Sequence, residues 1–301
     1  MRDFRYAAPT SLADATSILL GGGEVRILAG GTDLLPRMRD GSVVADTVLD
    51  VKRVPGMLDI VRVDGGLRLG AAVPFHRIRD DPRIVRAYPA LTDAARIVGG
   101  WQIQARASAG GNLCNASPAA DTTPALIVER ASCRIVGPEG ERLVPAAGFC
   151  TAPGRTVLES GELLTSLELP APEERAGSRY VRFIPRNEMD IAVAGAAAWV
   201  RLDEDGKTVA DARVALAAVA PTAVEAPDAA VSLIGGPATE AAFAAAGEIA
   251  REAARPITDM RGPADYRRHL AGVLVKRTLA GAADRAAGGS REPILFGNRD
   301  R

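Results

Sequence analysis

The chain has few of the residues that most often build metal centres and nucleophilic active sites. It holds three cysteines and two histidines among 301 residues, and only 4% of its residues are aromatic. The cysteines, at positions 114, 133 and 150, form no CxxC pair, and an iron–sulfur cluster usually takes four thiolates. The two histidines, His76 and His269, form no HExxH pattern. These counts argue against a disulfide framework, a metal site and Ser–His chemistry in this chain.

Long apolar runs and an excess of charge of one sign are also missing. No run approaches the roughly 20 apolar residues of a membrane span, and the start, MRDFRYAAPTSLADA, lacks the apolar core of an export signal. Basic and acidic side chains number 37 each, so nothing favours nucleic-acid binding. Neither GxGxxG nor a P-loop pattern occurs. We expect a cytoplasmic protein without a membrane span, a Rossmann-type site or a nucleic-acid partner.

The N-terminal half mixes helix and strand patterns. An apolar stripe over residues 12–20 predicts a helix that ends at three glycines, and residues 25–28 and 47–51 are typical of buried strands. Hairpins are predicted around residues 64–66 and 138–140, with a further strand over 162–169. Residues 74–98 favour helix with a break near Pro89. Residues 96–126 are dense in Gly, Asn and Ser, which predicts a long functional loop.

A polar, proline-containing stretch over residues 170–178 is the best candidate for a linker. After it, strands are predicted over 191–202 and 209–219, and then three helices. Runs of strands followed by runs of helices favour an α+β fold over a doubly wound one. We therefore predict a first domain over residues 1–170, with a subdomain boundary near 53–57. A small α+β domain over 179–285 and a tail over 286–301 follow.

Two pairs of glycines stand where a ligand could approach the backbone closely. Gly30 and Gly31 lie between a strand and a helix start, and Gly110 and Gly111 precede a polar loop. Successive glycine amides can bend into a concave anion-binding nest, so two nests could hold one diphosphate, although tight structural turns explain the same pattern. Asp121 either caps the helix predicted over 122–129 or accepts hydrogen bonds from a sugar or ribityl hydroxyl.

Four segments resemble one protein family: ILAGGTDLLPRMRDG, ASAGGNLCNASPAADTTPALI, GELLTSLELP and RNEMDIAVAGAAA. They are similar to the FAD-binding medium subunits of molybdenum hydroxylases, a family that includes xanthine and carbon monoxide dehydrogenases. The segments RVALAAVAPTAVEA and ITDMRGPADYRRHLAGVLVKRTL resemble the C-terminal domain of the same subunits. The resemblance covers roughly residues 3–283. It implies a two-subdomain FAD-binding fold of the PCMH type followed by a small α+β domain.

The resemblance also implies which residues bind FAD. Two backbone segments would clasp the diphosphate: Ile27, Leu28, Ala29, Gly30, Gly31, Thr32, Asp33 and Leu34, and Ser108, Ala109, Gly110, Gly111 and Asn112. Asp121 would bind the polar chain of the flavin, and Leu164 would lie against the adenine or the ring system. Val98 stands where the family often has an aromatic residue. Cys114 stands where an apolar side chain meets the isoalloxazine ring.

Arg182 stands where many members of the family have lysine. In the strand predicted around it, alternation places Arg182 on the face opposite Val181 and Phe183. One interpretation is a solvent-exposed strand arginine. The other, carried over from the family, is a cation near the flavin or its phosphates.

The function implied is electron transfer. Substrate would be oxidised at a molybdenum cofactor on a large partner subunit, and electrons would cross two [2Fe–2S] clusters on a small partner. Non-covalently bound FAD in this chain would pass them to NAD, quinone or oxygen, in what we expect to be a dimer of heterotrimers. No catalytic residue and no metal ligand are expected here. The alternatives are a self-sufficient flavin oxidase or dehydrogenase, and a non-enzymatic α+β interaction module.

Overall fold

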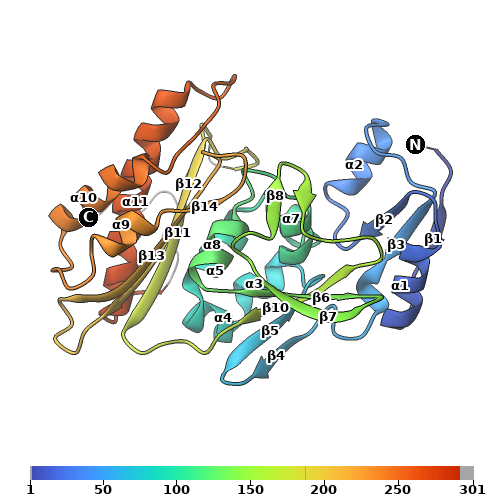
Figure 1. The fold of residues 1–301 in the computed structure, drawn as a ribbon, viewed down its shortest axis with the longest axis horizontal. Helices are drawn as coiled ribbons and strands as arrows, with labels where there is room; N and C mark the ends of the chain where they lie inside the picture. Colours follow the sequence, from blue (N-terminus) through green and yellow to red (C-terminus); the bar gives the residue numbers. More distant parts are fainter. Residues whose placement is uncertain (1, 187, 292–301) are drawn as a thin grey trace.

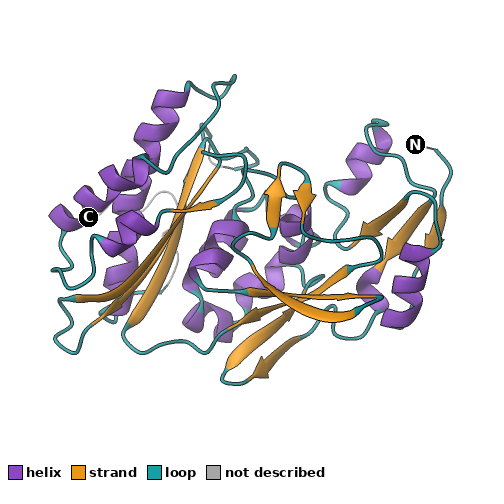
Figure 2. Ribbon diagram, in the orientation of Figure 1, coloured by secondary structure: helices purple, strands orange, loops and turns teal. Residues whose placement is uncertain are grey.

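Three β-sheets follow one another along the long axis of the molecule, in the order of the chain (Figure 1, Figure 2). The computed structural model describes residues 2–186 and 188–291. Helices fill the space between the second and third sheets and cover the outer face of the third. This mixture of mainly antiparallel sheets and segregated helices confirms the predicted α+β class. No helix among these residues is long and apolar enough to cross a membrane.

The first sheet is small and parallel, with β3 (Thr47–Asp50) between β1 (Arg5–Ala7) and β2 (Val25–Leu28). The predicted helix over 12–20 is α1 (Leu12–Leu20), which begins where the Ser11 hydroxyl accepts from the Asp14 amide. The short α2 (Leu34–Arg39) follows β2 after a glycine turn. A single 3-10 turn, η1 (Val51–Arg53), ends β3.

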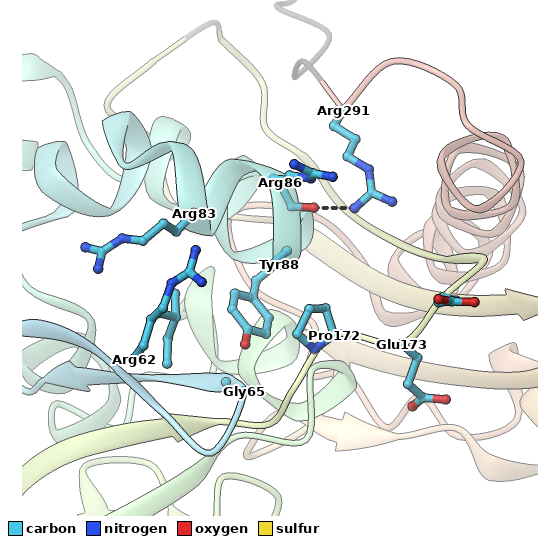
Figure 3. Close-up of a pocket in the computed structure, with 12 residues that line it drawn as sticks. Arg62, Gly65, Arg83, Arg86, Tyr88, Pro172, Glu173 and Arg291 are labelled. Carbon is cyan, nitrogen blue, oxygen red and sulfur yellow. Dashed lines mark hydrogen bonds between the residues drawn. The ribbon is translucent and has the colours of Figure 1, made fainter.

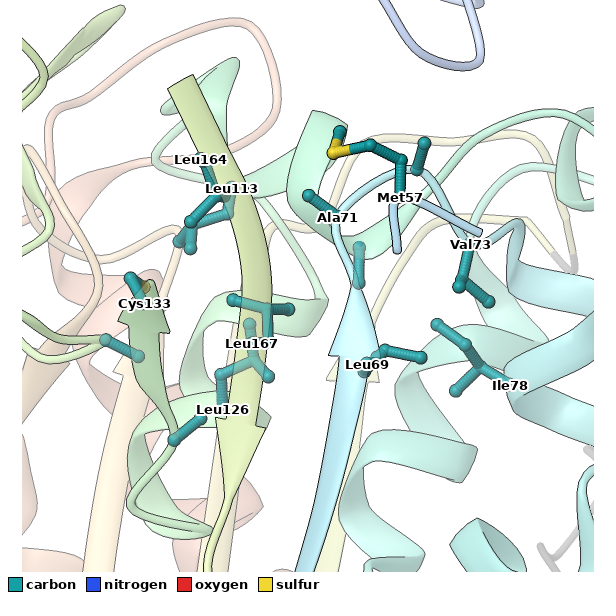
Figure 4. Close-up of a cluster of buried hydrophobic side chains, with 14 of the residues drawn as sticks. Met57, Leu69, Ala71, Val73, Ile78, Leu113, Leu126, Cys133, Leu164 and Leu167 are labelled. Atoms are coloured by element: carbon teal, nitrogen blue, oxygen red, sulfur yellow. The ribbon is translucent and has the colours of Figure 1, made fainter. Parts of the chain in front are cut away.

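The second sheet has five antiparallel strands in the order β4-β5-β10-β6-β7. A two-stranded ribbon, β8 (Cys150–Ala152) with β9 (Arg155–Thr156), lies between β7 and β10 in the chain. Both predicted hairpins are confirmed: β4 (Ile60–Val63) with β5 (Gly66–Gly70), and β6 (Ser132–Gly137) with β7 (Gly140–Pro145). The predicted strand over 162–169 is the central β10 (Leu163–Leu169). Leu69 and Leu167 from neighbouring strands are fully buried in the core beneath the helices (Figure 4).

The predicted long loop over residues 96–126 is wrong in part, because it contains short helices. The predicted helical stretch is α3 (Phe75–Asp80), α4 (Pro82–Ala87) and α5 (Pro89–Ile97), with a break before Pro89. Two helices occupy the expected loop, α6 (Trp101–Gln104) and α7 (Ala109–Cys114), and α8 (Thr122–Val128) at its end confirms the helix predicted over 122–129. At four and six residues, α6 and α7 are too short to show an apolar period in the sequence.

The third sheet, β11 (Ala176–Phe183), β12 (Ala194–Leu202), β13 (Val209–Ala217) and β14 (Val224–Glu225), is antiparallel. One face is covered by α10 (Glu240–Arg251), α11 (Ala264–Ala286) and the short α9 (Pro227–Val231), which confirms the three predicted helices. The other face packs on α5 and α8. The expected linker is shorter than predicted because β11 already begins at Ala176, and the strand expected from residue 191 begins at Ala194. Residues 292–301 of the expected tail lie outside the described residues.

Candidate cofactor-binding site

The first predicted clasp is a turn between β2 and α2. Ala29 to Asp33 leave the strand, and Gly31 adopts a left-handed φ of +78°, which a β-branched residue rarely takes. The Lys52 ammonium donates to the Ala29 carbonyl at 2.9 Å and also pairs with Asp50 at 2.7 Å. These contacts hold the start of the turn against β3.

The backbone amides of this turn are free to bind an anion. In the described part of the chain, the amides of residues 30–33 donate to no protein acceptor. Gly30, Gly31 and Thr32 are half-buried and Asp33 is exposed. Half-buried amides usually have partners, so this run of amides is a set of donors available to a ligand or to solvent.

The second predicted clasp is the first turn of α7. The Ser108 side chain caps this helix by accepting from the Gly111 amide at 3.1 Å. Asn112 is held from outside the helix, because its Oδ1 accepts from the Thr122 hydroxyl at 2.6 Å. The clasp is therefore connected to α8, the helix that follows Asp121.

The structure brings the two clasps into contact. A Cβ built on Gly30 would lie 2.2 Å from the Arg106 carbonyl oxygen, so only glycine allows the backbones to approach this closely. A Cβ on Gly111 would lie 3.9 Å from the Ala29 Cβ and 3.0 Å from the capping Ser108 hydroxyl, with no backbone atom among its close contacts. Gly30 thus serves the packing of the two segments, whereas Gly111 leaves space on the shared surface between them.

Asp121 has a different role from the predicted helix cap. It stands at the N-cap position of α8 but caps no backbone amide. Its two carboxylate oxygens accept instead from the Tyr180 hydroxyl at 2.8 Å and from Arg182 at 2.6 Å. Burial raises the pKa of Asp121 to about 6, while Arg182 and the Tyr180 hydroxyl oppose that rise. The cap interpretation is wrong, because the carboxylate turns toward the third sheet.

Arg182 is buried, with 4% of its surface exposed, so the interpretation as an exposed strand arginine is also wrong. Besides Asp121 it donates to the Ile97 carbonyl at 2.7 Å, next to Val98. Its Nε is buried without a hydrogen-bond partner among the described residues. The structure thus places Asp121, Arg182 and Val98 together, and Asn112 next to them through Thr122.

The remaining predicted contacts differ in exposure. Ile27 is exposed, and Leu28, Leu34 and Val98 are half-buried. Leu164 is buried in the core with Leu113 (Figure 4). Cys114 lies half-buried on α7, and burial raises the pKa of its thiol, which keeps it protonated at neutral pH. Cys114 therefore serves as a small apolar side chain and not as a nucleophile.

Three residues at the site were missed in the sequence: Lys52, Thr122 and Tyr180. Each acts through a contact to a residue at least ten positions away, which leaves no local pattern. One feature of the sequence could have pointed to Lys52: lysine is rare in this chain, with only three among its 37 basic residues.

The site fits a diphosphate-bearing cofactor such as FAD. A run of unpaired amides, the open face at Gly111 and the partnerless Nε of Arg182 together offer donors to an anionic, oxygen-rich ligand.

The sequence and the fold match known proteins over nearly their whole length. Residues 2–172 match the family model of the FAD-binding domain in molybdopterin dehydrogenase, and residues 179–282 match that of the CO dehydrogenase flavoprotein C-terminal domain. The carbon monoxide dehydrogenase medium chain of Hydrogenophaga pseudoflava is 33% identical, with 94% of this chain and 98% of that protein covered. The xanthine dehydrogenase FAD-binding subunit of Escherichia coli is 32% identical, with 96% and 99% covered.

Solved structures agree with these matches. Carbon monoxide dehydrogenase from Hydrogenophaga pseudoflava superposes with a TM-score of 0.89 at 32% identity, covering 95% of this chain and 98% of that chain. Quinoline 2-oxidoreductase from Pseudomonas putida 86 gives 0.89 at 30% identity, covering 95% and 99%. The predicted family, fold class and FAD cofactor are confirmed, and with them an oxidoreductase subunit. The chain therefore belongs to the family of FAD-binding medium subunits of molybdenum hydroxylases, which includes the xanthine and carbon monoxide dehydrogenases.

Proposed function

We propose that this chain is the electron-transfer subunit of a molybdenum hydroxylase, in which FAD bound at the two clasps passes electrons to an external acceptor. The observation that carries the proposal is the contact between the two glycine segments, the first of which has unpaired amides at residues 30–33. Neither segment alone would distinguish an anion site from a tight turn. Together, in a chain of this family, they form a two-sided diphosphate clasp.

The chain's own residues bind and orient the cofactor. The amides of residues 30–33 and the first turn of α7 hold the diphosphate, and Lys52 and Ser108 keep these segments in place. Asp121 and Arg182 lie beyond the clasps, and they would contact the polar chain or the ring of the flavin. When bound, FAD supplies the redox chemistry, since it accepts and releases electrons singly or in pairs. The attachment is non-covalent in our proposal.

The partner subunits that we propose are inferred from the names of the relatives. The carbon monoxide dehydrogenase relatives are named medium chains, so we propose a large partner with the molybdenum cofactor and a small partner with [2Fe–2S] clusters, assembled as a dimer of heterotrimers. The chain has three cysteines against the four thiolates that a cluster usually takes. Co-expression with candidate partner genes, followed by purification and metal analysis, tests this. A lone chain that oxidises an organic substrate would instead indicate a self-sufficient flavin enzyme.

The clasp is tested by the substitution Gly111→Val. The added branches would enter the space that the diphosphate needs, so we expect most bound FAD to be lost. The free energy of unfolding should fall by only about 1 kcal/mol, because position 111 is helical without a positive φ. FAD content is measured in the supernatant after acid precipitation, which releases non-covalently bound flavin.

Gly21→Val is the matched control. It makes the same chemical change at a helix end whose added Cβ meets only ordinary contacts at 3.4 Å. We expect this variant to retain full FAD. If Gly111→Val also retained full FAD with unchanged affinity, the assignment of the clasp would be wrong.

A further inference from the structure

A cavity of about 540 Å³ lies well away from the two clasps. The β4–β5 hairpin, α4, residues 172–174 and Arg291 line it (Figure 3). Figure 1 places α4, β4 and β5 at the lower edge of the molecule, whereas α2 and α7, which border the clasps, lie above the second sheet. The cavity therefore belongs to a different surface from the proposed FAD site.

Four arginines line this cavity and only two glutamates do: Arg62, Arg83, Arg86 and Arg291, against Glu173 and Glu174. Glu173 is already paired with Arg201 at 3.2 Å and with Arg213 at 3.0 Å, both outside the cavity lining. Its charge is therefore shared with other cations. The lining keeps a clear excess of positive charge in a chain whose total charge is zero.

Two of the four guanidinium groups have no partner within the part of the chain that the structure describes. Arg62, on β4, and Arg86, on α4, donate to no acceptor among the described residues. Arg83 is held by Asp81 through two hydrogen bonds. Arg291 donates to the backbone carbonyls of Arg86 and Ala176, which carry no charge that could neutralise it. Figure 3 shows that Arg62, Arg86 and Arg291 come from three separate segments of the chain, whereas Arg83 extends away from Arg86 and Arg291.

Arg291 lies among other positive charges, which is unfavourable without an anion beside them. The pKa of Arg291 is lowered, first by burial and then by the positive charges of Arg285 and Arg86. An arginine cannot relieve this repulsion by losing its proton near neutral pH. A bound polyvalent anion would relieve it, and each of the two unpaired planar guanidinium groups, on β4 and on α4, can pair with phosphoryl oxygens.

We propose that this cavity binds a small anion with a diphosphate group, either free diphosphate or the diphosphate of a nucleotide. Arg62 and Arg86 each take one phosphoryl group, and Arg291, whose partners are uncharged carbonyls, adds positive charge beside them. The volume exceeds what a single phosphate fills and has room for a nucleoside. Because the ligand would contact α4, the hairpin and the chain after α11, it would tie the first domain to the end of the C-terminal domain.

Titration calorimetry with inorganic pyrophosphate on the full chain tests the proposal. The protein is first saturated with FAD, so that the diphosphate clasp is filled and cannot contribute. We expect wild-type protein to bind pyrophosphate at low ionic strength, and the affinity to fall as salt screens the arginines. Arg62→Ala and Arg86→Ala should each weaken binding about tenfold, the usual loss of one charge-assisted contact.

Arg5→Ala is the matched control, since Arg5 is an exposed strand arginine whose side chain has no partner among the described residues. It removes the same charge from another sheet, and we expect unchanged affinity. Tighter binding of ADP than of pyrophosphate, with none of adenosine, would identify a nucleotide as the source. Equal or tighter binding of pyrophosphate would identify the free anion.

Two results would overturn the proposal. One is the absence of pyrophosphate binding by FAD-saturated wild-type protein up to about 10 mM, which corresponds to no useful affinity. The other is an equal affinity in Arg62→Ala, Arg86→Ala and Arg5→Ala. Neither result depends on the electron-transfer role, which the FAD content of Gly111→Val tests separately.

Discussion

The two faces of the third sheet differ in what they bury. The outer face packs apolar side chains on α10 and α11, as Val200, Leu274 and Leu279 show. The inner face carries Ser178, Tyr180 and Arg182 at alternate positions of β11, turned toward the FAD-binding domain. Because side chains alternate along a strand, one strand serves both purposes.

Each of these three residues has a buried acidic partner from the first domain. The Ser178 hydroxyl donates to Glu129, the Tyr180 amide donates to Asp93, and Arg182 pairs with Asp121. Asp93 also receives two hydrogen bonds from Arg285 of α11. Apolar contacts tolerate small shifts, whereas a buried charge needs its partner in place. We infer that the outer face supplies stability and the inner face sets the position of the C-terminal domain beside the clasps.

The largest effect is expected from Arg182→Ala. It leaves the Asp121 carboxylate buried without its cation, which typically costs about 3–5 kcal/mol of unfolding free energy. Urea unfolding measures this. Arg201→Ala is the control on the neighbouring strand, where a half-exposed pair with Glu173 is worth at most about 1 kcal/mol.

A double variant tests whether the unpaired buried charge causes the loss of stability. If both members of the pair are replaced by apolar residues, as in Asp121→Leu with Arg182→Met, much of the lost stability should return, because no buried charge is left unpaired. FAD affinity should stay low in this double variant. A single Arg182→Ala variant as stable as Arg201→Ala would contradict the role assigned to the inner face.

A smaller loss is expected from Leu279→Ala on the outer face. Leu279 is fully buried between α11 and the sheet, so the cavity left behind should cost about 3 kcal/mol. FAD affinity should change little, since the site residues keep their partners. Leu143→Ala, at a leucine with 54% of its surface exposed, is the control and should stay within about 0.5 kcal/mol of wild type. A large loss of FAD affinity in Leu279→Ala would show that the two faces are not separable.

Much of this architecture could be predicted from local patterns. The strand over 25–28 and both hairpins follow from short apolar or alternating runs bounded by glycine, and the glycine pairs pointed to the clasps. Local patterns do not predict contacts between residues that are far apart in the sequence. Asp121 and Arg182 are 61 positions apart, and nothing near Asp121 distinguishes a helix cap from half of a buried ion pair.

The short helices α6 and α7 were missed for a related reason. They hold four and six residues, several of them small, so their position is set by contacts such as Gly110 against Ala71 and not by an apolar stripe. The burial of Arg182 could not be predicted either, since alternation assigns a residue to a face of the sheet but does not say what covers that face.

The smallest effect expected concerns pH. Burial raises the pKa of Glu129 to about 7, opposed by the Ser178 hydroxyl and the charge of Arg213. The folded protein therefore binds a proton at Glu129 over a range in which the unfolded chain, with a usual pKa of 4.5, has lost it. Stability from this group is full below about pH 4.5 and is lost as the pH rises through 7, which amounts to about 2 kcal/mol between pH 5 and pH 8.

Glu129→Gln removes this titration but keeps an oxygen that can accept from Ser178. The variant should lose less unfolding free energy than wild type between pH 5 and pH 8, by about 2 kcal/mol. Asp121, whose pKa is also raised, contributes with the same sign in both proteins and cancels in the difference. Urea unfolding at the two pH values measures it. Parallel pH dependence in both proteins would mean that Glu129 stays ionised at the inner face, and that this face is better solvated than its burial indicates.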